Sequence, residues 1–354
     1  MAKQRELSVM EIGIIAKELQ ALIGGRLQKV YQPDDKEFIF DFHVPGQGKR
    51  LLKVMFPTLI FLTQQKPAQE EPPMFCQRLR KLLLGAMVQK VEQHGFERII
   101  VIELDAHALI FELFGTGNLV VAKNGLIELI MEARVWKERI LKMGEAYRFP
   151  VCKDIPSLSF EAFSSLLKEQ DFDSVVKWFA IGLSLGGKFA EELCGRAGID
   201  KTAKTLNVED AQRCFSELKA MLSSPVEPVI TEDGDIAPFR LKEHEGKQLT
   251  AVASFSEAVE KLSLRRHHRP APGDRERDRL LTIISQQQGQ LARIEHEIAE
   301  NTRKGELIYE HYQLVKGLLD EVHSLPKEEM KQRLATHEFI KAFDLKAKTI
   351  IIEL

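Results

Sequence analysis

Two neighbouring charged residues at the start of an apolar run are the first candidates for chemistry in this sequence. The stretch from His94 to Leu104 reads HGFERIIVIEL, and Glu97 and Arg98 stand between a Gly-Phe turn and a run typical of a buried strand. An exposed ion pair at this place would contribute almost nothing to stability. The same two groups at the mouth of a buried strand could instead form a binding site, and the residues alone leave both interpretations open.

A glycine-containing segment offers a second candidate. Residues 182–186 read GLSLG and fit the G-x-S-x-G pattern of hydrolases, which requires a strand before the serine. The preceding residues, VVKWFAIGL, predict a helix, so we reject a hydrolase. In a helix, tight turn and second helix, Gly186 and Gly187 would let backbone N–H groups approach a phosphate, and Lys188 would add a charge. The segment resembles a helix-hairpin-helix unit with altered glycine spacing, and a plain interhelical turn remains the alternative.

Two basic stretches are further candidates for phosphate binding. Arg78, Arg80 and Lys81 lie on a predicted helix, and a second run, RRHHR, occupies residues 265–269. Either stretch could equally be a solvated surface. The chain has only two Trp and four Tyr, so stacking on single-stranded bases is not indicated.

The composition restricts the class of protein. The formal net charge is only -2, so any basic surface for nucleic acid must be local. The four cysteines are scattered without metal-ligand spacing, and no phosphate-binding loop is present, so we expect no disulfide framework, metal or cofactor. The sequence has no signal-peptide core and no apolar run of membrane-spanning length, so we expect a cytoplasmic protein without membrane contact.

The elements that must position these residues follow from hydrophobic periodicity. Apolar residues at helical spacing predict a helix over Ser8–Ile23, and a second helix is predicted over Phe75–Val88. Strands are predicted at RLQKVYQP, FIFDFHV, KRLLKVMF, MVQKVEQHG, RIIVIEL, ALIFELF and NLVVAK, with turn residues between them. The first 150 residues or so therefore have an α+β pattern with mostly antiparallel strands.

The second half of the chain is predicted to be mainly helical. Helices are expected over 160–222, followed by a short α+β segment and a boundary at Pro270–Asp274. Apolar residues then alternate in steps of four and three, which predicts a coiled-coil helix over Asp274–Ser324, about 75 Å long, with a bend or a helix end at Asn301–Gly305. A solvated single helix is the alternative. This seam could pair within the chain, with a missing helix or in a dimer. A short helix and a strand-like tail, KTIIIEL, follow.

Several stretches, taken in order, resemble the NFACT family, whose members include RqcH in prokaryotes and NEMF in animals and which is also labelled fibronectin-binding protein A. The resemblance covers essentially the whole chain and is carried by SVMEIGIIAKEL, GGRLQKVYQP, MFCQRLRKLLLGAMVQKVEQHGFERIIVIEL, ELFGTGNLVVAKNGLI, GEAYRFP, SFSEAVEKL and the coiled-coil region.

The resemblance implies a domain organisation. It implies an N-terminal α+β domain over residues 1–155, similar in fold to formamidopyrimidine-DNA glycosylases, with residues 226–264 packing back on it. A helix-hairpin-helix module would occupy 156–224, and a coiled-coil arm would occupy 270–345.

The resemblance also implies a function, in ribosome-associated quality control. Family members bind the large ribosomal subunit that carries a stalled peptidyl-tRNA, bind tRNA, and promote template-free C-terminal tailing of the nascent chain. An Asp-Arg pair in the family matches Glu97-Arg98, and an acidic residue of the first helix matches Glu11. Arg98 could then clamp a phosphate or stack on a base, while Glu97 holds the guanidinium or accepts from a base edge. Glu11, Arg78, Arg80, Lys81 and the Gly186–Lys188 turn complete the expected tRNA surface.

Departures from the family keep other interpretations open. Glu replaces the usual Asp at residues 11 and 97, so RNA binding without tailing, or a coiled-coil scaffold, are alternatives. The sequence ends at Leu354, before the further RNA-binding domain of longer members, which fits either a short member or a truncated chain. Glycosylases use an N-terminal proline amine, whereas this chain starts Met1-Ala2-Lys3, so we expect no enzyme. The lack of a signal peptide or an anchor speaks against an adhesin.

Overall fold

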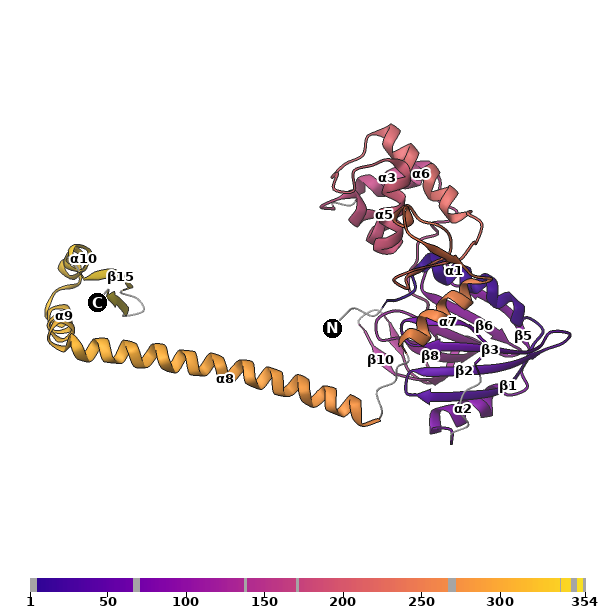
Figure 1. The fold of residues 1–354 in the computed structure, drawn as a ribbon, viewed down its shortest axis with the longest axis horizontal. Helices are drawn as coiled ribbons and strands as arrows, with labels where there is room; N and C mark the ends of the chain where they lie inside the picture. Colours follow the sequence, from indigo (N-terminus) through magenta and orange to yellow (C-terminus); the bar gives the residue numbers. More distant parts are fainter. Residues whose placement is uncertain are drawn as a thin grey trace. The chain divides into compact units, whose positions relative to one another are not determined.

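The computed structural model describes residues 5–65, 71–136, 139–169, 172–266, 272–337, 339–344 and 349–352. The chain divides into two compact units, Met1–His268 and Arg269–Leu354, which are described separately (Figure 1).

Two antiparallel sheets form the centre of the first unit. The four-stranded sheet has the order β1-β2-β3-β4, with strands β1 (Arg26–Asp34), β2 (Glu37–Val44), β3 (Gly48–Met55) and β4 (Leu59–Thr63). The five-stranded sheet has the order β5-β6-β7-β8-β9, with strands β5 (Val88–Gln93), β6 (Ile99–Leu104), β7 (His107–Glu112), β8 (Asn118–Lys123) and β9 (Leu126–Ile130). Since these strands occur together with helices, the α+β class predicted from the sequence is confirmed.

One apolar core joins the two sheets. The rings of Phe40 on β2 and Phe111 on β7 meet edge to face with centroids 5.5 Å apart, and both side chains are fully buried. Helix α1 (Val9–Glu18) adds Ile12 and Ile15 to the same core, and the 3-10 turn η1 (Leu19–Leu22) continues it. The N-terminal helix and the β2–β3 hairpin, in which Val44 pairs with Gly48, are therefore confirmed.

Two boundaries of the α+β region differ from the prediction. The second helix, α2, spans Met74–Leu83 and does not reach Val88, because Gly85 adopts a left-handed φ of 82° and Val88 begins strand β5. Strands β4 and β9 were not predicted, and two further short strands, β10 (Arg134–Val135) and β11 (Ile140–Leu141), form a separate pair.

A second apolar core lies among helices. It is built by α3 (Phe160–Glu169), α4 (Val175–Lys177), the π-helical turn η2 (Trp178–Gly182), α5 (Gly186–Ala197) and α6 (Val208–Leu222). Val9 and Met10, from the first turn of α1, are buried in this core as well. The helical character of this segment is confirmed, whereas the helix-hairpin-helix assignment stays a prediction.

The segment after α6 contacts both cores. Its elements are β12 (Val229–Thr231), β13 (Ile236–Ala237), the short turn η3 (Lys242–His244), β14 (Leu249–Ala251) and α7 (Phe255–Arg266). The start of α7 is tied to α1, because the backbone N–H groups of Phe255 and Ser256 donate to the Glu18 carboxylate at 2.6 and 2.8 Å. The Ser256 hydroxyl accepts from the backbone N–H of Leu62 on β4 at 3.1 Å. The division of this unit into separate domains stays a prediction.

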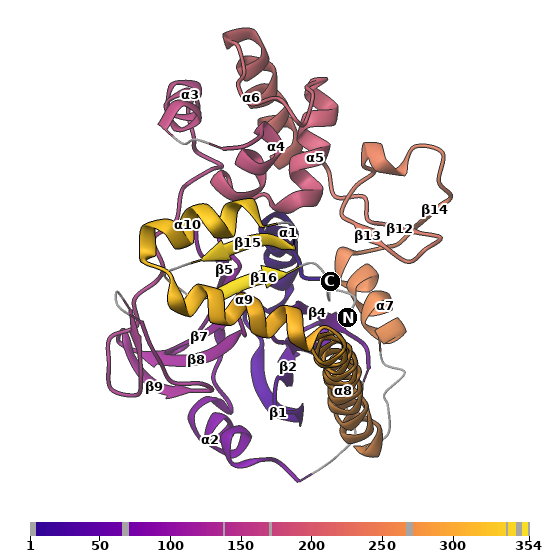
Figure 2. The ribbon, with the colours of Figure 1, turned by 90° about the vertical axis from the view of Figure 1, so that its left-hand side faces the viewer.

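The second unit contains one long helix and a small terminal fold. Its elements are α8 (Pro272–Glu310), α9 (Tyr312–Ser324), α10 (Lys327–Thr336) and the hairpin of β15 (Ile340–Asp344) and β16 (Thr349–Ile352). Leu318 and Leu334 are buried where α9 and α10 lie side by side (Figure 2). The predicted bend or helix end at Asn301–Gly305 is wrong: α8 continues through it, and the break lies at His311.

The seam predicted for a coiled coil is exposed in the described part of this unit. Leu291, Ile294 and Ile298 on α8 are exposed by 56, 52 and 59%. Coiled-coil pairing and a dimer through it stay predictions. In the basic run at 265–269, residues 267–269 and the side chains of Arg265 and Arg266 lie outside what the structure describes. None of the described helices combines the length and the apolar character needed to cross a bilayer.

Candidate functional site

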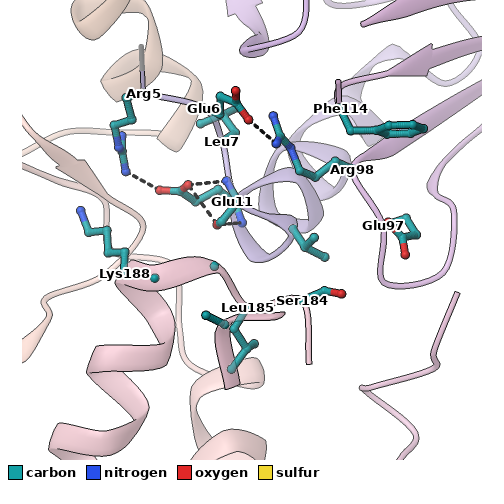
Figure 3. A pocket seen from close by; sticks show the side chains of 15 residues that line it. Arg5, Glu6, Leu7, Glu11, Glu97, Arg98, Phe114, Ser184, Leu185 and Lys188 are labelled. Carbon is teal, nitrogen blue, oxygen red and sulfur yellow. Dashed lines mark hydrogen bonds and ion pairs between the residues drawn. The ribbon is translucent and has the colours of Figure 1, made fainter. Parts of the chain in front are cut away.

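A pocket of about 530 Å³ lies where the N-terminus of α1, the turn before β6 and the start of α5 meet (Figure 3). Its lining residues are Arg5, Glu6, Leu7, Ser8, Val9, Glu11, Glu97, Arg98, Phe114, Ala180, Ser184, Leu185, Gly186, Gly187 and Lys188. The pocket thus brings together six of the residues singled out in the sequence, namely Glu11, Glu97, Arg98, Gly186, Gly187 and Lys188. Arg78, Arg80 and Lys81 do not line it.

Arg98 stands at the edge of this pocket, directly before β6. Its guanidinium donates to the Glu6 carboxylate at 2.5 Å and to the backbone carbonyl of Pro57 at 3.1 Å. Its Nε–H is buried and has no acceptor among the described residues. Glu6, and not Glu97, therefore holds the guanidinium, which corrects the expectation that Glu97 holds it and leaves open the contact of Glu97 with a base edge.

Glu97 is a half-buried carboxylate beside Arg98. Burial raises its pKa, and a hydrogen bond from the backbone N–H of Arg98 partly offsets this. Gln93 holds the local backbone by donating its side-chain amide to the Glu97 carbonyl at 2.9 Å. A half-buried carboxylate with a raised pKa can accept from a base edge or, when protonated, donate to one.

Glu11 is buried at the wall of the pocket, with only 1% of its surface exposed. Its carboxylate accepts from the backbone N–H of Ser8 at 2.8 Å, from the Ser8 hydroxyl at 3.0 Å and from Arg5 at 2.6 Å. The Ser8 hydroxyl in turn accepts from the backbone N–H of Glu11 at 3.3 Å, so Ser8 and Glu11 form a reciprocal capping box that begins α1. The S-x-x-E spacing of Ser8 and Glu11 could have revealed this role in the sequence. Both carboxylate oxygens are engaged inside the protein, and Glu11 supports the site from within.

The start of α5 forms the opposite wall. Ser184 and Gly186 adopt left-handed φ values of 57° and 74°, which turn the chain sharply from η2 into α5. The N-cap residue, Leu185, provides no side-chain cap, and a side chain on Gly187 would meet nothing within 4 Å. Backbone N–H groups of an uncapped helix start favour an anion. A helical turn and not a strand precedes Ser184, so the G-x-S-x-G match at residues 182–186 lacks the strand that a nucleophile elbow requires.

Lys188 is paired with acidic groups that the sequence had not singled out. Its ammonium forms an ion pair with Asp235, lies 3.4 Å from the Glu243 carboxylate, and donates to the Ile236 carbonyl at 3.0 Å. Although burial raises the pKa of Asp235, Arg5 and Lys188 hold it below its usual value. Much of the positive charge of Lys188, which was predicted to bind phosphate, is therefore already neutralised by these carboxylates.

The acidic groups near Lys188 also resemble a metal site in their grouping. Asp235, Glu243 and His244 place one ligand atom each within 4.8 Å of one another. The His244 Nδ1 atom accepts from the backbone N–H of Leu241 at 3.3 Å, so the proton of the neutral ring is on Nε2, and Nε2 cannot bind a metal in that form. With Lys188 also at the two carboxylates, these residues do not fit a metal ion.

The basic residues of α2 lie apart from the pocket. The Arg80 guanidinium donates to the Val30 carbonyl through Nε at 2.8 Å and through a terminal nitrogen at 2.6 Å. This contact attaches α2 to β1, so Arg80 has a structural role. Arg78 and Lys81 are exposed on the helix surface.

Comparison with known sequences decides the family. A profile described as the NFACT N-terminal and middle domains matches residues 9–346. The chain belongs to the NFACT family. Over 90% of its length it is 28% identical to the archaeal Rqc2 homolog aRqcH of Methanocaldococcus jannaschii, of which it covers 52%. Over 51% of its length it is 26% identical to the Rqc2 homolog RqcH of Bacillus subtilis, of which it covers 35%.

This NFACT chain therefore spans about half or less of the length of these relatives. Over 45% of its length it is also 28% identical to the ribosome quality control complex subunit NEMF homolog of Drosophila melanogaster, of which it covers 16%. Among solved structures, the N-terminal part of the fibronectin/fibrinogen-binding protein from Streptococcus suis matches 73% of the chain with a TM-score of 0.60. At 20% identity, this likeness concerns the fold alone.

Proposed function

We propose that this NFACT chain is the tRNA- and ribosome-binding part of a ribosome quality-control factor. The observation that carries the proposal is the pocket between α1, β6 and α5, which joins Arg98, Glu97 and the uncapped start of α5. The names of the relatives, which include a ribosome quality control complex subunit, support the same role.

The chemistry of the pocket supports an RNA ligand with at least one exposed base. The Arg98 guanidinium lies at the pocket edge, where a phosphate could replace Glu6 as its partner, and Phe114 beside it offers a ring to a base. Glu97 would contact the base edge as acceptor or donor. An unpaired nucleotide next to a backbone phosphate meets all three contacts.

The finer parts of the proposal concern the ribosome. The partner would be a cytoplasmic large ribosomal subunit that carries a stalled peptidyl-tRNA, and the role would be non-catalytic support of template-free C-terminal tailing. The predicted helix-hairpin-helix module would contact tRNA, and the coiled-coil arm would contact the subunit. The exposed apolar seam of α8 is consistent with such an arm.

The test is tRNA binding combined with co-sedimentation on large ribosomal subunits over a salt titration. Arg98→Ala should weaken tRNA binding by about tenfold, the effect of one charged hydrogen-bonding contact. It should also reduce the slope of log K against log salt by about 1, because one phosphate contact is lost. Arg303→Ala is the matched control for tRNA binding, since Arg303 is an exposed arginine on α8 that neither lines the pocket nor belongs to the helical module proposed to contact tRNA.

The outcomes separate the parts of the proposal. If Arg98→Ala binds tRNA like Arg303→Ala, the pocket is not the tRNA site. If the protein sediments with subunits but tRNA is not enriched, the factor binds the ribosome without acting in tailing. If it binds neither tRNA nor subunits, the proposed function is wrong.

A further inference from the structure

Asp235 lies behind the pocket and contacts two of its cations. It directly precedes β13, and its carboxylate pairs with Lys188 through one oxygen and with the Arg5 Nε at 3.2 Å through the other. The next carbonyl, of Ile236, accepts from Arg5 at 2.7 Å and from Lys188 at 3.0 Å. Asp235 itself does not line the pocket, so it acts on a ligand only through the two cations.

The two cations that hold this carboxylate could pair with a phosphate oxygen instead. A guanidinium and an ammonium that share one anion form the usual pair of contacts for a carboxylate or a phosphate. The pocket lining holds three cationic residues, Arg5, Arg98 and Lys188, and three acidic ones, Glu6, Glu11 and Glu97. Asp235 therefore adds a negative charge to a balanced set, and a phosphate that approaches Lys188 must compete with it.

We propose that Asp235 is a built-in counter-ion that limits the affinity of the pocket for nucleic-acid phosphate. This inference rests on the proposed tRNA binding and concerns its regulation. Backbone contacts give affinity without sequence information. Asp235 neutralises the positive charge of Lys188 and thus lowers the affinity for any RNA. The choice between RNAs then depends on the base that Arg98 and Glu97 contact.

The experiment compares charge-neutralising variants of the full chain. Asp235→Asn should bind tRNA, and an unrelated RNA hairpin, about two- to fivefold more tightly at low salt, the scale of a partly exposed ion pair. Its salt dependence should be steeper by about 0.7–0.9 in slope, since one more cation reaches a phosphate. Asp235→Glu restores the charge and should return both values toward those of the wild type.

A matched control separates this local effect from net charge. Glu300→Gln also removes one negative charge and releases one lysine, because Glu300 pairs with Lys304 at 3.7 Å on α8, and neither residue lines the pocket. A rise in affinity and slope with Asp235→Asn alone supports the inference. Equal effects of Asp235→Asn and Glu300→Gln overturn it, as does weaker binding by Asp235→Asn at an unchanged melting temperature.

A second measurement does not depend on tRNA binding. The rate of acetylation of the Lys188 amine by an amine-reactive reagent, followed by mass spectrometry, reports how firmly Asp235 holds that amine. Asp235→Asn should raise this rate several-fold, and inorganic tripolyphosphate should lower it again. An unchanged rate refutes the inference even if tRNA binds. A raised rate without any tRNA binding refutes the proposed function and leaves the counter-ion role intact.

Discussion

Replacement of Glu11 by alanine tests whether this residue supports the fold or contacts RNA. The carboxylate is buried, accepts from Ser8 and pairs with Arg5. Its removal costs about 1 kcal/mol for the lost helix cap, and breaking a buried ion pair costs about 3–5 kcal/mol. Because Arg5 keeps Asp235 and the Ile236 carbonyl, we expect a total near the lower limit of the sum, about 4 kcal/mol.

The assay for this variant is thermal unfolding followed by circular dichroism. For a folded unit of this size, about 2–4 °C are lost per kcal/mol, so the melting temperature should fall by about 8–16 °C. Glu6→Ala is the matched control, because Glu6 forms a partly exposed pair with Arg98 that is worth about 0–1 kcal/mol. If Glu11→Ala has the same melting temperature as Glu6→Ala and yet loses tRNA binding, the structural role assigned to Glu11 is wrong and this residue contacts RNA directly.

Two further predictions concern the turn that carries Glu97 and Arg98. Gly95→Ala should destabilise the protein by about 1–3 kcal/mol, because Gly95 has a φ of 52° and a Cβ there would lie 2.5 Å from the Cys152 sulfur. In chemical denaturation, Cys152→Ala in the same chain should recover part of this loss, and no recovery would disprove the clash. His94 stacks on Phe149 with ring centroids 3.7 Å apart, and burial lowers its pKa while Glu92 partly opposes this. The unfolded chain then binds more protons, so stability should fall as the pH drops below about 6.5. His94→Gln should flatten that part of the melting-temperature curve, and a curve identical to the wild type would contradict the prediction.

The sequence predicted elements well where apolar spacing and turn residues agree. Helix α1 and strands β2, β3, β6 and β8 have clear periodicity and were placed correctly. The end of α2 was missed because the apolar residues Leu82 to Leu84 continue the helical period, whereas the left-handed Gly85 stops it. The break at His311 has no glycine or proline as a signal, and the Asn301–Gly305 segment, which has weak helix formers, remained helical.

For the candidate site, the sequence indicated chemistry but not partners. Glu97, Arg98 and the Gly186 turn were noticed from their types and local spacing, and the fold brings them to one pocket. The partner of Arg98 is Glu6, which is distant in the chain, so no local pattern could reveal it. Asp235 was missed for the same reason, since its contact with Lys188 depends on how the residues beside β13 pack against the start of α5.

The burial of α1 in two cores has a consequence for motion. Val9 and Met10 belong to the helical core, whereas Ile12 and Ile15 belong to the core between the sheets. A hinge movement between the helical core and the core between the sheets would have to expose some of these side chains. The free-energy cost would be about 1.5–3 kcal/mol for each side chain that becomes fully exposed. The pocket walls, which come from both halves, are thus held at a fixed separation. A ligand meets a preorganised cleft and loses little affinity to ordering it.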